Sequence, residues 1–274
     1  MNKISIITIN YNDKVGLEKT FYSVINQTSK IFEYIIIDGG STDGCKEFLE
    51  QNTDKITYWI SEKDSGIYNA MNKGIRAAKG DYLLFLNSGD DLYSTKVLQE
   101  VEREIDGTKD LYYGNAIFKY SHGDVFVSYP NKLTFDFFTN NSLCHQASFI
   151  KRTLFENIFY YNEDFKVISD WEFMIYSLCI KSISYKHIAV TVSFYDLGGI
   201  SSNPEYKSVI KEETDIVMNK YFSMFIDDYH EMNDLRELKS KRVLNILHIK
   251  KFPIAWKFLK GISNLILIFL PKRK

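Results

Sequence analysis

The chain has 274 residues, enough for one large domain or two small ones with a substantial core. Hydrophobic residues make up 45% and charged residues 25%, the ordinary balance of a folded globular protein. The 34 lysines and arginines against 35 aspartates and glutamates give a net charge of -1, which argues against bulk nucleic-acid binding.

The cysteines and the amino terminus bear on where the protein works. Cys45, Cys144 and Cys179 are odd in number and widely spaced, so they indicate neither a disulfide framework nor a zinc site. The chain begins directly with a strand pattern and shows no signal-peptide pattern. We therefore expect a reducing, cytoplasmic environment.

Strand and helix patterns alternate over the first 110 residues. Apolar runs rich in β-branched residues predict buried strands at residues 3–9, 33–37, 56–60 and 82–86. Apolar residues at helical spacing predict helices between them, the last over residues 67–78. A strand and a helix alternating about every 25 to 30 residues indicate a parallel sheet covered by helices.

After residue 110 the pattern changes to hairpins and short helices. Residues 111–120 and 125–129 flank a Ser-His-Gly-Asp turn, which predicts a β-hairpin. No linker rich in Pro, Gly or Ser separates the two halves. We therefore expect one domain over residues 1–205, made of halves 1–110 and 111–205, and a helical extension over residues 206–274.

The stretch after the fourth strand is Asn87-Ser88-Gly89-Asp90-Asp91. Hard divalent cations prefer such oxygen ligands, and open parallel sheets bind ligands beyond the carboxyl ends of their strands. The pattern therefore predicts a metal-assisted nucleotide-sugar site. An acidic turn that caps the next helix is the alternative.

Two further segments carry polar residues at element ends. Asp38 follows the second strand and opens a glycine-rich turn, in which Ser41 or Thr42 is expected to cap the next helix. Asp170 and Glu172 stand near the amino end of a predicted helix. The helix dipole stabilises carboxylates at that position, so a purely structural role is the alternative for both residues. No G-x-G-x-x-G follows the first strand and no G-x-x-x-x-G-K-[ST] occurs, so a metal is the obvious way to hold a phosphate.

The carboxy-terminal segment is both apolar and basic. Residues 239–274 contain ten lysines or arginines and no acidic residue. The uninterrupted apolar run at residues 262–270 is too short to span a bilayer, which needs about 20 residues. Residues 243–274 therefore predict an interfacial helix on an anionic membrane, with a helix packed on the core as the alternative.

Several ordered motifs together resemble one family. Residues 5–12 (Ser-Ile-Ile-Thr-Ile-Asn-Tyr-Asn), 35–44, 61–74 and 80–91 are similar to family 2 glycosyltransferases of the GT-A fold. The likeness covers roughly residues 3–200 and is strongest to bacterial enzymes of capsule, exopolysaccharide or O-antigen synthesis. It implies an α/β fold with a Rossmann-like, mostly parallel sheet and helices on both faces.

The resemblance also implies donor-binding residues. Asp38 would accept a hydrogen bond from the nucleobase, usually uracil, and Asp64 would lie against the nucleotide. Asn72 and Lys73 would support the base or the diphosphate. The other implied donor-binding positions are Asn10, Asn87, His145, Gln146 and Gly199, the last in the Gly198–Ser201 loop near the diphosphate.

The resemblance assigns the metal and the base as well. Asn87 and Gly89 stand where the family's acidic metal motif often has aspartates, which leaves Asp90 as the expected Mn²⁺ or Mg²⁺ ligand and Asp91 as the second. Asp170 matches the general base. The metal would neutralise the leaving diphosphate, and Asp170 would take the proton of the acceptor hydroxyl in a single inverting displacement.

The implied partners are a nucleotide-sugar donor, probably with UDP, and a glycan or polyprenyl-linked oligosaccharide acceptor, with no nucleic acid. The implied location is the cytoplasmic, inner face of a bacterial plasma membrane. Two other functions stay open. A nucleotidyltransferase also uses an α/β domain and a metal, and a non-catalytic sugar-binding relative would explain the Asn87 and Gly89 departures.

Overall fold

The computed structural model describes residues 3–120, 122–196, 199–229 and 241–270, and the chain divides into two compact units, residues 1–217 and 218–274. The described strands of the first unit form one sheet in the order β3-β2-β1-β4-β8-β6-β9-β5, with β7 paired to β6. The strands are β1 (Ile4–Asn10), β2 (Phe32–Asp38), β3 (Tyr58–Ser61), β4 (Tyr82–Phe85), β5 (Asp91–Leu92), β6 (Leu111–Tyr120), β7 (Gly123–Val127), β8 (Ser148–Lys151) and β9 (Tyr185–Asp196).

The four strands predicted in the first half are confirmed, and they pair in parallel. β1 is buried along its whole length and lies between β2 and β4, while β3 adds to the far side of β2. A strand covered on both faces needs apolar side chains in both directions, which explains why four of the seven residues of β1 are isoleucines. This half of the sheet is the α/β arrangement that the alternating pattern predicts.

The second half of the sheet is mixed, as the expected change to hairpins after residue 110 implies. β8 is antiparallel to both β4 and β6, and β6 is parallel to β9. β6 and β7 form the predicted hairpin, although Ser121 in its turn lies outside the described residues. Hairpins bring antiparallel pairs into the sheet because they return the chain without a crossover.

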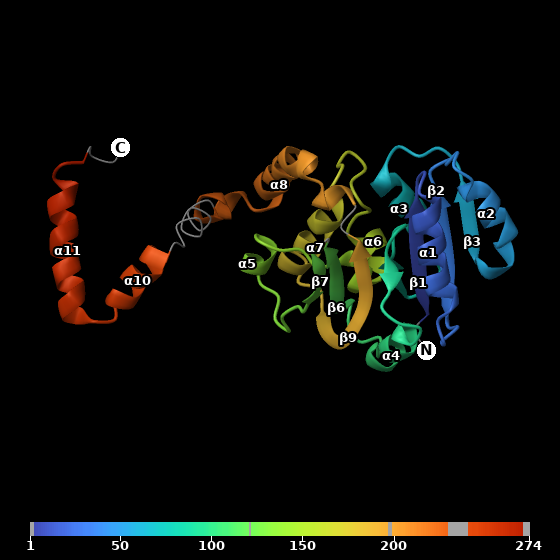
Figure 1. Ribbon diagram of the computed structural model, residues 1–274, viewed down its shortest axis with the longest axis horizontal. Helices are drawn as coiled ribbons and strands as arrows, with labels where there is room; N and C mark the ends of the chain where they lie inside the picture. The colour runs from blue at the N-terminus through green and yellow to red at the C-terminus, as the bar shows by residue number, and fades with distance from the viewer. Residues whose placement is uncertain (1–2, 121, 197–198, 230–240, 271–274) are drawn as a thin grey trace. The chain divides into compact units, whose positions relative to one another are not determined.

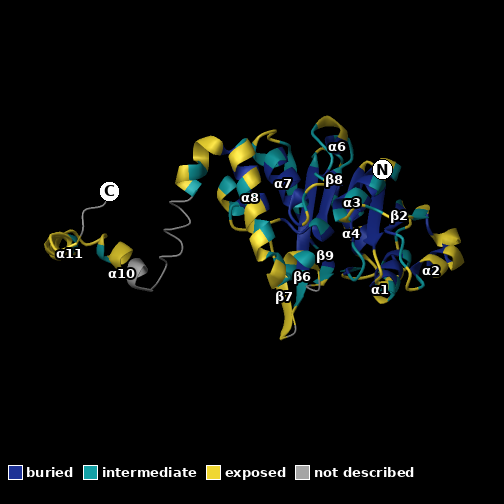
Figure 2. Ribbon diagram, turned by 90° about the horizontal axis from the view of Figure 1, so that it is seen from above, coloured by how far each residue is buried: buried dark blue, intermediate teal, exposed yellow. Residues whose placement is uncertain are grey.

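Helices lie on both sides of the sheet, so that its strands are the most buried part of the first unit (Figure 2). In Figure 1 the elements of this unit run from blue β1 to the gold of β9. Its helices are α1 (Lys14–Ile25), α2 (Cys45–Gln51), α3 (Ile67–Ala77), α4 (Val97–Glu104), α5 (Phe135–Phe138), α6 (Thr153–Asn157), α7 (Ser169–Cys179) and the first part of α8 (Lys207–Tyr221).

The predicted cap of α2 is wrong. The helix starts after Gly44, which has a φ of 94° and caps it without a side-chain hydrogen bond. The Ser41 hydroxyl instead donates to Asp38 at 2.5 Å, and the Thr42 amide donates to Asn12 at 2.8 Å. Both residues stabilise the turn after β2 rather than the helix that follows.

The first compact unit continues beyond residue 205, where the change to a mostly helical pattern suggested a boundary. In α8, Val217 is fully buried and Glu213 is only 6% exposed. The Glu213 carboxylate accepts hydrogen bonds from the backbone amides of Lys166, Val167 and Ile168. The start of α8 therefore packs as part of the sheet-containing unit.

The second unit holds the end of α8 and two later helices, α10 (Lys241–Ile249) and α11 (Pro253–Leu267). Within the described ranges, no helix combines the length and the apolar character that crossing a bilayer requires. Large apolar side chains on α11 are nevertheless exposed, including Ile254 at 88% and Phe258 at 74%.

We expect a chain that ends at residue 205 to be less stable than one that ends at residue 229. The shorter chain loses the Glu213 hydrogen bonds and the buried side chain of Val217, together worth about 3 kcal/mol or more. Urea denaturation followed by circular dichroism measures the difference. Equal unfolding midpoints for the two chains would contradict the assignment of α8 to the first unit.

Candidate functional site

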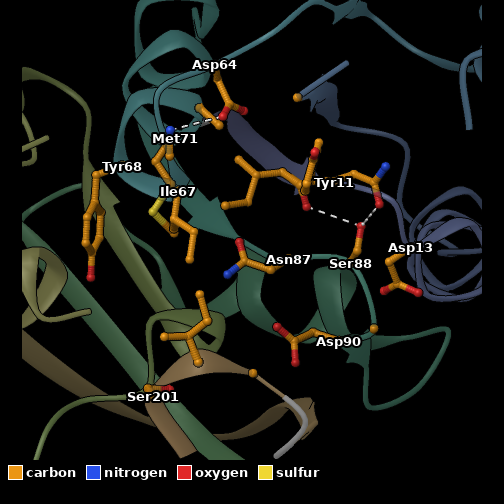
Figure 3. A pocket seen from close by; sticks show the side chains of 18 of the residues that line it. Tyr11, Asp13, Asp64, Ile67, Tyr68, Met71, Asn87, Ser88, Asp90 and Ser201 are labelled. Carbon is orange, nitrogen blue, oxygen red and sulfur yellow. Dashed lines mark hydrogen bonds between the residues drawn. The ribbon is translucent and has the colours of Figure 1, made fainter. Parts of the chain in front are cut away.

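A cavity of about 950 Å³ opens where β1, β2 and β4 end. Its walls come from the residues that directly follow these strands and from α3, the start of α7 and residues 195–196 and 199–201 (Figure 3). The carboxyl ends of parallel strands meet at one edge of a sheet, so residues distant in sequence converge there. The cavity therefore lies where the sequence predicted a ligand site.

A hydrogen-bond chain ties the three strand ends together under this cavity. The Ser88 hydroxyl donates to Asn10 Oδ1 at 2.7 Å, and Asn10 Nδ2 donates to Asp38 Oδ1 at 2.6 Å (Figure 3 shows the Ser88 contact). Asn10 and Asp38 are almost fully buried, so each bond replaces contacts with water that burial removes. The chain fixes the cavity floor.

Asp64 lies on the wall opposite Asp90, with Asn87 between them in Figure 3. Its Oδ1 accepts a hydrogen bond from the Gly66 amide at 3.0 Å, just before α3 begins. A Cβ at Gly39, just after β2, would lie 2.6 Å from Asp64 Oδ2, so a larger residue there would displace this carboxylate.

Asp90 is a buried carboxylate whose hydrogen-bond donors are uncharged. Gln146 Nε2 donates to its Oδ2 at 2.8 Å, and the Asp196 amide donates to its Oδ1 at 3.0 Å. Gly89 precedes it with a φ of 94°, a left-handed conformation that turns the chain back toward the cavity. Burial outweighs the hydrogen bonds and raises the pKa of Asp90 to about 6.

Asp170 lies in the first turn of α7 and is held from two sides. His145 Nδ1 lies 2.9 Å from its Oδ2, and the Tyr68 hydroxyl donates to its Oδ1 at 3.0 Å. Burial raises the pKa of Asp170, but the hydrogen bond and charge of His145 and the Tyr68 hydroxyl outweigh burial and hold that pKa below its ordinary value. Asp170 is therefore ionised at neutral pH, the form that a general base requires.

The arrangement matches a known family. The family model for glycosyl transferase family 2 matches residues 5–165. A Mycobacterium tuberculosis protein named "PGL/p-HBAD biosynthesis glycosyltransferase" is 32% identical over 216 residues, 76% of this chain and 82% of that protein. The chain belongs to glycosyltransferase family 2.

Other relatives agree with this family. TuaG of Bacillus subtilis, named for teichuronic acid biosynthesis, is 30% identical over 146 residues, 51% of this chain and 58% of TuaG. The S. aureus TarS 1–349 structure in complex with UDP-GlcNAc matches at a TM-score of 0.63 and 18% identity, over 79% of this chain and 67% of that one. Against the longer TarS chain, the match spans 36% of TarS. The expected GT-A fold is confirmed.

Most of the residues that sequence reasoning assigned to the site line this one cavity of the glycosyltransferase. They come from strand ends, from the loop before α3, from the 3-10 helix His145–Ala147 and from α7, and their convergence was expected from the family motifs. They are Asn10, Asp64, Asn87, Asp90, His145, Gln146, Asp170 and Gly199. Gly198, from the same predicted loop, lies outside the described residues.

Asp38 does not belong to the described lining of the cavity, although it was expected to contact the nucleobase. Its carboxylate accepts hydrogen bonds from Asn10, from the amide and hydroxyl of Ser41, and from Ser61 at 2.6 Å. In this conformation Asp38 supports the floor from beneath.

Asn72 and Lys73 also face away from the described lining of the cavity. Asn72 Nδ2 donates to Tyr161 O and to Glu163 Oε1, both at 2.8 Å, so its amide joins α3 to another segment. Lys73 forms an ion pair with Glu62 at 2.7 Å. Both contacts follow from the helical turn, which rotates residues 72 and 73 away from Ala70 and Met71 on the cavity side.

Asp91, expected as the second metal ligand, points elsewhere. Its Oδ1 lies 2.9 Å from Lys19 Nζ and 3.5 Å from Lys119 Nζ, and it is absent from the described cavity wall. Asp91 begins β5, where successive side chains point to opposite faces. Asp90 and Asp91 therefore cannot both face the cavity.

Sequence reasoning missed two tyrosines. Tyr11 follows β1 directly, lines the cavity and is 67% exposed, as suits a ring that stacks on a planar ligand. Its signal was an aromatic residue immediately after a buried strand. Tyr68 is 102 positions from Asp170, and no sequence pattern reveals their contact.

Replacing Asp90 with asparagine should stabilise the metal-free protein above pH 6. The folded pKa of about 6 exceeds the ordinary 3.8, so the wild type loses stability as pH rises between about 4 and 6, by about 3 kcal/mol in all. The side-chain amide of the variant does not titrate, so its advantage should grow over this window and then level off. Urea unfolding in EDTA at several pH values measures it.

Asp91→Asn is the matched control, because this neighbouring carboxylate has two lysine partners. It should show no comparable gain. Parallel stability curves for wild type and Asp90→Asn across pH 4 to 8 would contradict the raised pKa.

Proposed function

We propose that this glycosyltransferase moves a sugar from a nucleoside diphosphate donor, most simply a UDP-sugar, to a hydroxyl group of its acceptor with inversion at the anomeric carbon. The observation that carries the proposal is that Asp90 and Asp170, 80 positions apart in the sequence, line the same cavity. The shared fold with a structure that holds UDP-GlcNAc supports a nucleotide-sugar donor.

The names of the relatives support an acceptor in a bacterial surface glycan. One relative is named for PGL/p-HBAD biosynthesis and another for teichuronic acid biosynthesis. We infer that the acceptor of this chain is likewise a glycan or a lipid-linked oligosaccharide, as in capsule, exopolysaccharide or O-antigen synthesis. Such acceptors are built at the inner face of the plasma membrane, where we place this enzyme.

On the acceptor side, Asp170 is the proposed general base. The acceptor oxygen forms a bond to the anomeric carbon while the bond from that carbon to the diphosphate oxygen breaks. The hydroxyl proton passes to Asp170, whose lowered pKa keeps it ionised beforehand. His145 and Tyr68 hold the two carboxylate oxygens and so fix the direction of attack.

On the donor side, the cavity offers oxygen ligands and cations. Asn87 and Asp90 line it, and Asn87 Oδ1 is buried without a hydrogen-bond partner in the described structure. These two side chains supply the oxygen ligands that would hold Mg²⁺ or Mn²⁺. The described ranges contain no group of three His, Cys, Asp or Glu residues that could hold a metal. When bound, such an ion supplies positive charge for the departing diphosphate.

Two lysines offer further positive charge to neutralise the diphosphate. Lys63 and Lys166 line the cavity from different walls and are exposed, so their ammonium groups can reach a bound anion. Tyr11 offers a face for the base, and Asp64 offers a carboxylate to the nucleotide. These residues bind and orient the donor.

The test is a screen of nucleotide sugars with Mn²⁺ and a lipid-linked acceptor, in which the released product is identified. A glycosyltransferase releases nucleoside diphosphate, whereas a nucleotidyltransferase releases pyrophosphate. Asp170→Asn should lower turnover by about 10²- to 10⁴-fold, because the base is lost. Its affinity for the nucleoside diphosphate, measured by calorimetry, should stay near that of wild type.

Asp164→Asn is the matched control, since Asp164 is an exposed acid shortly before α7. It should leave turnover unchanged. Near-normal turnover by Asp170→Asn would refute the base, and donor binding without any turnover by the wild type would identify a non-catalytic relative.

The proposed membrane contact rests on residues 243–274. On α11, Ile254, Phe258, Ile262 and Leu265 recur at helical spacing and are all exposed. The described lysines of this segment are Lys250, Lys251, Lys257 and Lys260. An exposed apolar row beside basic residues is typical of a helix that lies in the interface of an anionic bilayer.

The full chain should sediment with phosphatidylglycerol-containing vesicles at low salt. Each lysine near an anionic surface contributes about 1 kcal/mol, so changing the four described lysines to glutamate should weaken binding by at least about 100-fold. The matched control changes four exposed lysines of the first unit to glutamate: Lys46, Lys96, Lys132 and Lys207. Wild-type protein that stays in the supernatant would exclude the membrane contact.

A further inference from the structure

The segment before α7 is held by a residue from another helix. The backbone amides of Lys166, Val167 and Ile168 donate to the carboxylate of Glu213 at 2.6, 3.1 and 3.2 Å. Ile168 is the N-cap of α7 and makes no side-chain capping bond of its own. Three successive amides directed at one carboxylate form an anion-binding concavity, and Glu213 fills it from α8.

This contact leads directly to the proposed base. Asp170 lies two residues beyond Ile168, in the first turn of α7. The carbonyl of Val167 accepts a hydrogen bond from the Tyr68 hydroxyl at 2.5 Å, and the same hydroxyl contacts Asp170. Glu213 therefore anchors the segment from which both Tyr68 and Asp170 take their positions.

The same segment forms part of the cavity wall. Lys166 and Val167 both line the cavity, whereas Glu213 lies behind them and is 6% exposed. Glu213 is thus not part of the described cavity wall. Any effect that it has on sugar transfer must pass through the backbone of residues 166–168.

We propose that Glu213 is a positioning residue for the transfer reaction, holding the start of α7 so that Asp170 meets the acceptor hydroxyl in line with the donor. This inference rests on the proposed role of Asp170 as the base. Reactions between held groups are sensitive to displacements of about 1 Å. A loosened segment therefore lowers the rate of the chemical step more than it lowers donor affinity.

The experiment compares Glu213→Ala with Glu212→Ala in the full chain. Glu212 is the exposed neighbour on α8 and serves as the matched control. Glu213→Ala should lower kcat by about 10- to 100-fold while the Kd for the nucleoside diphosphate changes less than about twofold. Glu212→Ala should change neither. A kcat for Glu213→Ala within twofold of wild type would overturn the inference.

A double-mutant cycle separates positioning from a general loss of structure. In the Asp170→Asn background, Glu213→Ala should lower the residual single-turnover rate no further, because its effect passes through the missing base. The same fold-loss in both backgrounds overturns the inference. Wild-type turnover by Asp170→Asn alone refutes the proposed base itself, whereas an inactive Asp170→Asn with a fully active Glu213→Ala overturns only the role of Glu213.

If Glu213→Ala does not fold, as judged by near-ultraviolet circular dichroism, Glu213→Gln decides the question. The amide oxygen of glutamine keeps one acceptor in the concavity, so folding should survive while the grip on the three amides weakens. We expect its kcat to fall by at least about threefold with an unchanged Kd. A wild-type kcat for this folded variant also overturns the inference.

Discussion

The parallel pairing of β1 with β2 and β4 is the constraint on which the site depends. Its register sets Asn10 opposite Asp38 and Ile7 opposite Phe85, so three strands end at one edge of the sheet. Polar residues follow each strand there, and the Ser88–Asn10–Asp38 hydrogen bonds join the three ends. A slip by one residue would take Asn10 out of register with Asp38 and break the hydrogen bonds of this floor.

Two carboxylates in this cavity have environments that move their pKa values in opposite directions. Asp90 is buried among neutral donors, which raises its pKa, whereas His145 and Tyr68 lower that of Asp170. Such a separation commonly marks different chemical roles. This difference suits the roles that we propose for them, with Asp90 beside a cation on the donor side and Asp170 as the base on the acceptor side.

The sequence predicted the positions of strands and helices better than it predicted contacts between side chains. Apolar runs and turn residues located β1, β2, β4 and the β6–β7 hairpin to within a few residues, because burial on both faces dictates composition. They could not show that Asp38 is saturated by Ser41 and Ser61, or that Asp91 pairs with two lysines. Those outcomes depend on side-chain direction at an element's end, which a shift of one residue reverses.

The boundary expected at residue 205 also shows that the sequence pattern reveals elements better than it reveals how they pack. A change toward a helical pattern marks where the strands stop, but it does not mark where the packing around Asp170 stops. Glu213 accepts hydrogen bonds from amides 45 to 47 positions earlier in the chain. A single buried carboxylate does not change the hydrophobic periodicity of a helix, so the sequence pattern does not reveal this contact. Since buried backbone amides must find acceptors, the successive amides of residues 166–168 are the feature that requires a residue such as Glu213, and the first part of α8 packs with the sheet for that reason.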